Sequence, residues 1–323
     1  MTPKNFRNFI AYQLPDGFCD SFEFFEQSLN GRQSTDPTGG SWYTVGFVEL
    51  PGGEFYLDLQ GSAWLFFVQF NERILPGAVR DEHVAKRVAE LEERQGYKVN
   101  RKLYAQLKDD VTFDLLPKAF IRRSIVPVFI ITPNILITCT SSHKKSQEAI
   151  DLLGQVFADD NDWRPALMTP QSHPVDVLTR IAQQDPEGAR FVATDAAVLK
   201  GADKETIRIR DRTIGSEEVQ TLLKDEYQVH ELGLDFFEDG YSSIDADELT
   251  CTLIVNDKLI FKRVQLPAAR VADHMGDSDE AADLAGLAWL FATEFKKVTL
   301  ALFSEMGSAP VGSTAQTDDE DEL

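Results

Sequence analysis

The chain has 323 residues, of which 43% are hydrophobic, enough for one large mixed domain or two to three packed subdomains. No stretch approaches the roughly 20 consecutive apolar residues of a membrane span, and the first residues lack the apolar core of an export signal. Cys19, Cys139 and Cys251 are odd in number and far apart in the sequence, which fits neither a disulfide framework nor a paired-thiol metal site. We therefore expect a cytoplasmic protein without a membrane partner.

The formal net charge of −21 argues against nucleic-acid binding, because Lys and Arg make the phosphate contacts of such proteins. The charge is unevenly distributed, however. Between Asn71 and Arg123, twelve basic residues stand against nine acidic ones, so this stretch carries +3 and the remainder carries −24. This distribution is compatible with a basic concave surface on a body that repels DNA elsewhere. It is equally compatible with a solvated helix face covered by salt bridges.

Two apolar runs of strand length, at 6–14 and 62–70, predict core strands, and Gly- and Pro-containing turns lie between them. After Pro76 the apolar residues recur at helical spacing on both sides of Gly96, at Val84, Val88, Leu91, Leu103, Leu107 and Val111. This pattern predicts a helical hairpin whose polar faces carry most of the basic residues.

Pro117 ends the second helix of this hairpin and places Phe120 directly after it, between Lys118 and Arg122. A Phe in such a position is most often part of its own core. The alternative is a contact between copies of the chain, since large aromatic residues anchor interfaces. A β-hairpin at 125–140 and a helix at 144–157 are expected to follow.

A second half of the chain begins at Trp163-Arg164-Pro165. We expect helices at 174–184, after an N-cap at Ser216, and at 280–306, and strands at 206–210, 227–237, 249–255 and 259–266. Beyond Gly307 the chain is rich in Ser, Ala, Pro and Gly and ends in a run of acids at 318–322, a composition typical of disorder.

The expected fold class is therefore α/β of the α+β type, with mixed or antiparallel sheets and a projecting helical hairpin. We expect three parts. They are an N-terminal sheet domain at 1–165 with a helical finger at 76–118, a C-terminal α/β base domain at 166–306, and an acidic tail at 307–323.

Residue patterns typical of enzymes are hard to find in this sequence. The five histidines are isolated, and neither a phosphate-binding Gly-rich loop nor a GxSxG elbow is present. Asp245, Asp247 and Glu248 before a strand superficially resemble a metal-dependent nuclease, but a solvated turn is favoured. We expect no enzymatic activity, no metal and no cofactor.

Five segments, in the family's order and at nearly its spacing, resemble the RdgC family of recombination-associated proteins: FRNFIAYQL at 6–14, RILP at 73–76, LKDD at 107–110, LLPKAF at 115–120 and SEEV at 216–219. The similarity covers about residues 4–305. The resemblance implies a horseshoe-shaped monomer that pairs at two ends to close a ring. The ring would hold duplex DNA in a positively charged hole, with little sequence preference, and limit the access of RecA to DNA in the nucleoid.

By this resemblance, Phe120 is the aromatic that enters a partner pocket at the gate of the ring, the finger lies beside the gate, and 208–212 faces the hole. Charge and resemblance together predict DNA contacts from Arg73, Arg80, Lys86, Arg87, Arg94, Lys98, Arg101, Lys102, Lys118, Arg122, Arg123, Arg208, Arg210 and Arg212. Tyr97 and Asp211 stand where characterised members have basic residues, which weakens the expected positive lining.

Two other functions stay open at this point. The first is an acidic interaction factor that binds RecA or another recombination protein directly, with the tail at 318–322 mimicking the charge of DNA. The second is a nuclease. A gel shift on naked duplex distinguishes DNA binding from the interaction factor, and cleavage with magnesium or manganese tests the nuclease.

Overall fold

The computed structural model describes residues 3–21, 29, 31–157, 163–203, 205–243, 249–276 and 279–308. It is a mixed α/β fold with an antiparallel sheet, which confirms this part of the expected fold class. The acids at 245–248 and the tail at 318–322 lie outside the described residues. No helix in the described ranges is both long enough and apolar enough to cross a membrane.

Contacts divide the chain into two compact units. Unit 1 comprises 1–25, 49–66 and 126–323, and unit 2 comprises 26–48 and 67–125. The chain passes from one unit to the other within strands β4 (Ala63–Ile74) and β5 (Phe120–Ile131). The domain boundary near residue 165 expected from the sequence stays a prediction.

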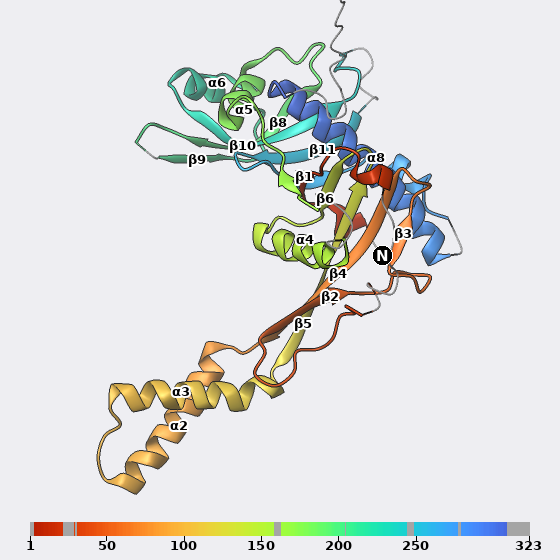
Figure 1. The fold of residues 1–323 in the computed structure, drawn as a ribbon. Helices are drawn as coiled ribbons and strands as arrows, with labels where there is room; N and C mark the ends of the chain where they lie inside the picture. Colours follow the sequence, from red (N-terminus) through yellow and green to blue (C-terminus); the bar gives the residue numbers. More distant parts are fainter. Residues whose placement is uncertain are drawn as a thin grey trace, which may run out of the picture. The chain divides into compact units, whose positions relative to one another are not determined.

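Unit 1 contains most of the secondary structure (Figure 1). Besides parts of β4 and β5, its strands are β1 (Phe9–Gln13), β3 (Tyr56–Asp58), β6 (Ile135–Thr138), β7 (Ala166–Leu167), β8 (Phe191–Lys200), β9 (Thr206–Ile209), β10 (Gln228–Phe237), β11 (Leu249–Asn256) and β12 (Ile260–Gln265). Its helices are the 3-10 helices η1 (Pro3–Phe6) and η2 (Phe18–Ser21), α4 (His143–Phe157), α5 (Pro174–Gln183), α6 (Glu217–Lys224), α7 (Ala268–Ala272) and α8 (Glu280–Glu305).

Strand β1 is buried on both faces, which explains its almost uninterrupted apolar sequence. On one face Phe9 stacks on Phe261 of β12 at 4.2 Å between ring centroids and contacts Phe295 of α8 at 4.3 Å. On the other face the hydroxyl of Tyr12 lies 2.7 Å from that of Ser146 in α4. Helices α8 and α4 therefore cover opposite faces of this part of the sheet.

Strands β8, β9, β10, β11 and β12 continue the sheet of unit 1 in the order β12-β11-β10-β8-β9. Helix α5 packs on β10 and β8, and Leu232, Leu234 and Phe236 of β10 are fully buried. Glu231 and Asp235 alternate with these residues and are only partly buried. Because side chains alternate across a strand, the face opposite α5 is polar.

Unit 2 is built around a helical hairpin of α2 (Gly77–Gln95) and α3 (Arg101–Leu115), which confirms the hairpin expected from the sequence. Gly96 ends α2 with a left-handed backbone (φ 73°), which Gly adopts without strain. Pro117 follows α3 in the 3-10 turn η3 (Leu116–Lys118). Strand β2 (Tyr43–Phe47) pairs with the unit 2 part of β4.

Most expected elements lie within a few residues of their observed bounds, but β2, β3, β7, β8 and α7 were not expected. The apolar run at 6–14 forms a strand only from Phe9, because η1 precedes it. Strand β8 was not expected, since alanines and Asp195 lower the strand propensity of its sequence. Ser216 occupies the N-cap of α6 as expected, although its hydroxyl makes no capping hydrogen bond.

Candidate nucleic-acid interface

Three of the four basic side chains of helix α2 form ion pairs with acidic neighbours. Arg80 lies 3.1 Å from Asp81, Lys86 lies 2.7 Å from Glu82 and Arg87 lies 3.0 Å from Asp114 of α3. The Nε of Arg94 donates a hydrogen bond to the carbonyl of Glu90 at 3.3 Å. This part of the hairpin corresponds to the salt-bridged helix face that the charge pattern also allowed.

The hairpin tip, residues 95–108, is different. It contains four cations and no acid. Lys98, Arg101 and Lys102 are exposed, and none of them has an ion-pair partner among the residues that the structure describes. Unpaired, exposed cations are available to phosphate groups without breaking an existing contact. The hairpin tip is therefore the best candidate in unit 2 for contact with a nucleic-acid backbone.

Local hydrogen bonds hold the backbone of the hairpin tip in place. The carbonyl of Glu92 accepts a bond from the Gly96 N–H at 2.8 Å, and the Glu92 carboxylate accepts one from the Val99 N–H at 2.8 Å. The side chain of Asn100 caps α3 by accepting from the Leu103 N–H at 2.9 Å. The tip is thus an ordered turn rather than a loose loop.

Arg73 is buried, with 7% of its surface exposed, and its guanidinium donates to the carbonyls of Leu116 and Pro37. It joins the end of the hairpin to the loop before β2 within unit 2. Those hydrogen bonds occupy both terminal nitrogens, so Arg73 is a structural residue and we remove it from the expected set of DNA contacts.

The remaining basic residues near the end of the hairpin are exposed. Arg122 lies 2.5 Å from Glu72, and Arg123 contacts Asp36 at 2.9 Å, whereas Lys118 has no ion-pair partner within the described ranges. Phe120 begins β5 and is 88% exposed. The interpretation of Phe120 as part of its own core is therefore wrong. An aromatic side chain with this exposure is available for a contact with another surface.

In unit 1 the polar sheet face is hollowed by a cavity of about 700 Å³. Its lining includes Arg208 and Arg210 at β9, with Lys262 and Glu231 paired at 2.6 Å. Arg208 and Arg210 are exposed and have no ion-pair partner in the described part of the chain, whereas Arg212 lies 3.4 Å from Glu218. The polar sheet face thus offers two available guanidinium groups.

A second cavity on the same face, of about 530 Å³, contains the carboxylates of Asp195 and Asp235. Burial, together with the negative charge of Asp195, raises the pKa of Asp235 above its ordinary value. Asp235 therefore gives up its negative charge at a higher pH than a solvated Asp does. The sequence did not predict that Asp195 and Asp235 lie close together, because the two residues are on different strands.

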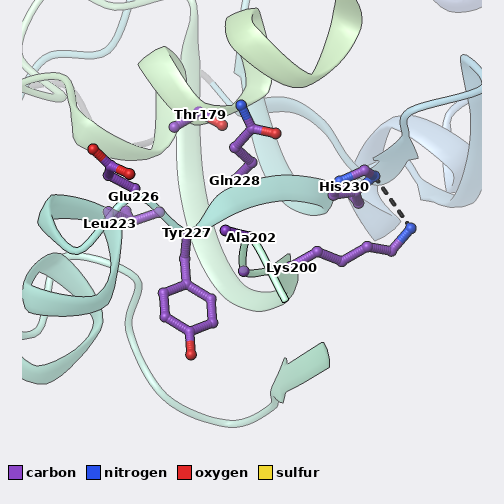
Figure 2. A pocket seen from close by; sticks show the side chains of 9 residues that line it. Thr179, Lys200, Ala202, Leu223, Glu226, Tyr227, Gln228 and His230 are labelled. Carbon is purple, nitrogen blue, oxygen red and sulfur yellow. Dashed lines mark hydrogen bonds between the residues drawn. The ribbon is translucent and has the colours of Figure 1, made fainter. Parts of the chain in front are cut away.

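The cavity in Figure 2, of about 620 Å³, lies at the ends of β8 and β10. His230 Nδ1 is 2.7 Å from the Asp257 carboxylate and 3.3 Å from Lys200 Nζ. An Nδ1 that carries a proton donates it to Asp257, and an Nδ1 without a proton accepts from Lys200, so the two contacts belong to different protonation forms of the ring. The ring of Tyr227 points away from the histidine, and its hydroxyl donates to Glu205 at 2.7 Å.

Comparison with known proteins identifies the family. The sequence model described as "Putative exonuclease, RdgC" matches residues 5–309. The chain belongs to the RdgC family. Related RdgC-family proteins carry the name "Recombination-associated protein RdgC". The protein of Pseudomonas putida KT2440 is 26% identical over 315 residues, which cover 95% of this chain and 98% of that protein.

Two further members are similarly distant. The protein of Pseudomonas aeruginosa PAO1 is 26% identical over 316 residues, covering 95% of this chain and 98% of its own length. The protein of Shewanella frigidimarina is 28% identical over 237 residues, which cover 72% of this chain and 77% of that protein. The family resemblance seen in the sequence is thus confirmed.

The family description names an exonuclease, whereas the relatives are named for recombination. In the described part of the chain, no group of three or more His, Cys, Asp and Glu side chains could hold a metal ion. The absence of enzymatic activity stays a prediction.

Tyr97 and Asp211, which stand where the RdgC pattern has basic residues, both lie on exposed surfaces. Tyr97 is 65% exposed at the hairpin tip, next to Lys98. Asp211 lies on the polar sheet face between Arg210 and Arg212, and its backbone is left-handed (φ 56°), a conformation that Asp tolerates better than most residues. At least one exposed cation is therefore adjacent to each of the two positions.

Proposed function

We propose that this RdgC-family protein binds duplex DNA without sequence preference, as a dimer that encircles the duplex, and that it restrains RecA-mediated recombination in the nucleoid. The observation that supports this proposal best is the exposed cations without ion-pair partners in the described chain. They belong to two surfaces, the hairpin tip with Lys98, Arg101 and Lys102, and the polar sheet face with Arg208 and Arg210.

Phosphate contacts from such cations carry no sequence information, so they bind any duplex. An otherwise acidic chain repels DNA from the rest of its surface, because the stretch outside 71–123 carries −24. Encirclement needs only modest attraction, since the duplex leaves only when the ring opens. Few phosphate contacts therefore suffice for a long-lived complex, which reconciles DNA binding with the net charge of −21.

Closure of a ring requires contacts between copies of the chain. Phe120 is 88% exposed, and unit 2 carries further exposed apolar side chains, Trp42, Tyr43, Ile74, Val79, Phe113 and Ile125. Large aromatic side chains are enriched in protein interfaces. These residues support a self-association surface in unit 2 in which Phe120 is the anchor.

The proposal is tested by gel shifts on two unrelated duplexes of equal length. Lys98→Glu with Lys102→Glu is expected to weaken binding to both duplexes by the same factor. The control is Arg80→Glu with Lys86→Glu, which changes the charge equally on the same hairpin but at ion-paired positions. We expect the control to weaken binding much less. Equal losses in the two variants, or different losses for the two duplexes, would contradict the proposal.

Two alternatives predict different results in the same experiment. An acidic interaction factor would not shift naked duplex and would co-purify with RecA after the DNA has been digested. A nuclease, which the family description suggests, would cleave the duplex when magnesium or manganese is added. The proposed function predicts a shift without metal and intact DNA with it.

A further inference from the structure

The cavity in Figure 2 carries groups of opposite charge at its two ends. Lys200 and His230 lie at one end, and Glu226 lies at the other. All of the lining residues belong to unit 1, and they come from α5, α6, β8, β10 and the adjoining turns. The volume of about 620 Å³ is within the range of ligand-binding cavities, about 300–1,000 Å³. None of the expected DNA contacts lines this cavity.

At one end of the cavity, the ammonium group of Lys200 is available to a ligand. Its Nζ lies 3.3 Å from Nδ1 of His230, and the same Nδ1 lies 2.7 Å from the Asp257 carboxylate. Lys200 has no other hydrogen-bond or ion-pair partner among the residues that the structure describes. The contact with Asp257 is the shorter one, and it joins the ring to a carboxylate. Whenever Nδ1 donates to Asp257, Lys200 can therefore pair with an anionic group in the cavity.

At the other end, Glu226 presents a carboxylate from an unfavourable backbone conformation. Its φ is 65°, in the left-handed region that Glu rarely adopts. The residue follows α6 in a turn where the Tyr227 N–H donates to the carbonyl of Leu222 at 3.2 Å, and Gly is the usual residue at this position of such a turn. The Glu226 side chain is exposed and has no ion-pair partner in the described ranges. Unfavourable backbone conformations cluster at ligand sites, and this one places an unpaired acid on the cavity wall.

The lining between the two ends is uncharged. Gln228 lies between Glu226 and His230 in Figure 2, and its amide can both donate and accept hydrogen bonds. Leu223 adds apolar surface. A ligand that matches this lining carries an anionic group at one end, a cationic group at the other and a polar or apolar middle. Amino acids and short peptides have this chemistry.

We propose that the cavity binds a zwitterionic ligand, an amino acid or a short peptide, with its carboxylate at Lys200 and its ammonium group at Glu226. Both ion pairs use side chains that have no ion-pair partner in the described part of the chain, so no existing salt bridge has to break. A ligand with only one of the two charges leaves Lys200 or Glu226 unpaired and therefore binds more weakly. This inference goes beyond the proposed function and does not depend on DNA binding.

Isothermal titration calorimetry of the full-length protein without DNA tests the proposal. The probes are alanine and trialanine, and the one that binds more tightly is then compared with its N-acetyl form and with its C-terminal amide. The first modification removes the ammonium group and the second removes the carboxylate. We expect a Kd in the millimolar range or below for the zwitterion, and binding about 5- to 30-fold weaker for each modified form. Tighter binding of trialanine would identify a peptide as the ligand, and tighter binding of alanine a free amino acid.

Two variants connect each charge of the ligand to its residue. Lys200→Gln should remove the preference for the zwitterion over the amide, and Glu226→Gln should remove the preference over the N-acetyl form. Lys224→Gln and Asp225→Asn are matched controls, because they remove the same charges from exposed neighbouring positions that do not line the cavity. Both controls should bind like the unchanged protein.

Three results would overturn the inference. The first is that neither alanine nor trialanine binds at millimolar concentrations. The second is that the modified forms bind as tightly as the zwitterion. The third is that Lys200→Gln and Glu226→Gln behave like their controls. Circular dichroism checks that all four variants are folded, so that a loss of binding reports on the cavity.

Discussion

Arg73 offers the sharpest test of how the basic residues divide between structure and DNA contact. Its buried guanidinium bonds to the carbonyls of Leu116 and Pro37, two segments of unit 2 that are far apart in the sequence. Arg73→Ala removes both hydrogen bonds and leaves two carbonyls without these donors. We therefore expect a loss of stability in unit 2 and no specific loss of DNA contact.

The size of the effect follows from the contacts. A hydrogen bond to a charged group contributes about 1.5–3 kcal/mol, so losing two of them in a buried site costs about 3–6 kcal/mol. Arg122→Ala is the matched control, because it removes the same kind of charge from the same unit. Its ion pair with Glu72 is exposed on both sides, and such pairs contribute less than about 1 kcal/mol.

Hydrogen exchange followed by mass spectrometry measures the local stability of each unit separately. In Arg73→Ala the amides of 67–125 should exchange much faster, while those of α8 keep their protection. In Arg122→Ala, both 67–125 and α8 should keep their protection from exchange. Equal protection in the two variants would refute the structural role of Arg73. The structural role would also be refuted if Arg73→Ala stayed folded and lost more duplex affinity than Arg122→Ala.

Three further predictions follow from burial and exposure. Because burial and Asp195 raise the pKa of Asp235, its carboxylate form costs stability above that pKa, so Asp235→Asn should raise the melting temperature at neutral pH. The gain should shrink as the pH falls toward the ordinary Asp value of 3.8; a constant gain would contradict this cause. Phe120→Ser should shift the protein toward monomer in analytical ultracentrifugation and leave its circular dichroism unchanged, whereas an unchanged dimer would remove Phe120 from the interface. Burial raises the pKa of the Cys139 and Cys251 thiols, so neither should react with a thiol reagent until urea unfolds the protein, as peptide mapping would show.

The local pattern of the sequence was sufficient to predict the elements whose signals are local. The hairpin followed from helical spacing on both sides of Gly96, and the β5–β6 hairpin followed from two apolar runs joined by a turn. Strand β8 was not predicted because its alanines and Asp195 are poor strand formers. Its neighbours β9 and β10 supply the hydrogen bonds that order it.

The candidate site depended on contacts that the sequence does not display. Residues as far apart as Arg87 and Asp114, or Arg123 and Asp36, form ion pairs, so a count of cations overestimates those available to DNA. Arg73 looks like its basic neighbours in the sequence but is buried. Only folding distinguishes the paired cations from Lys98, Arg101 and Lys102, which have no ion-pair partner among the described residues.

The central claim is that these available cations hold duplex DNA by its phosphates. Duplex affinity measured over a range of salt concentrations tests it most directly, because each phosphate contact contributes about −0.9 to the slope of log affinity against log salt. We expect a clearly negative slope. Lys98→Ala with Lys102→Ala makes it shallower by about 4, because a dimer loses two contacts from each chain, whereas Arg80→Ala with Lys86→Ala leaves it unchanged. A slope near zero, or the same slope in both variants, would contradict the account.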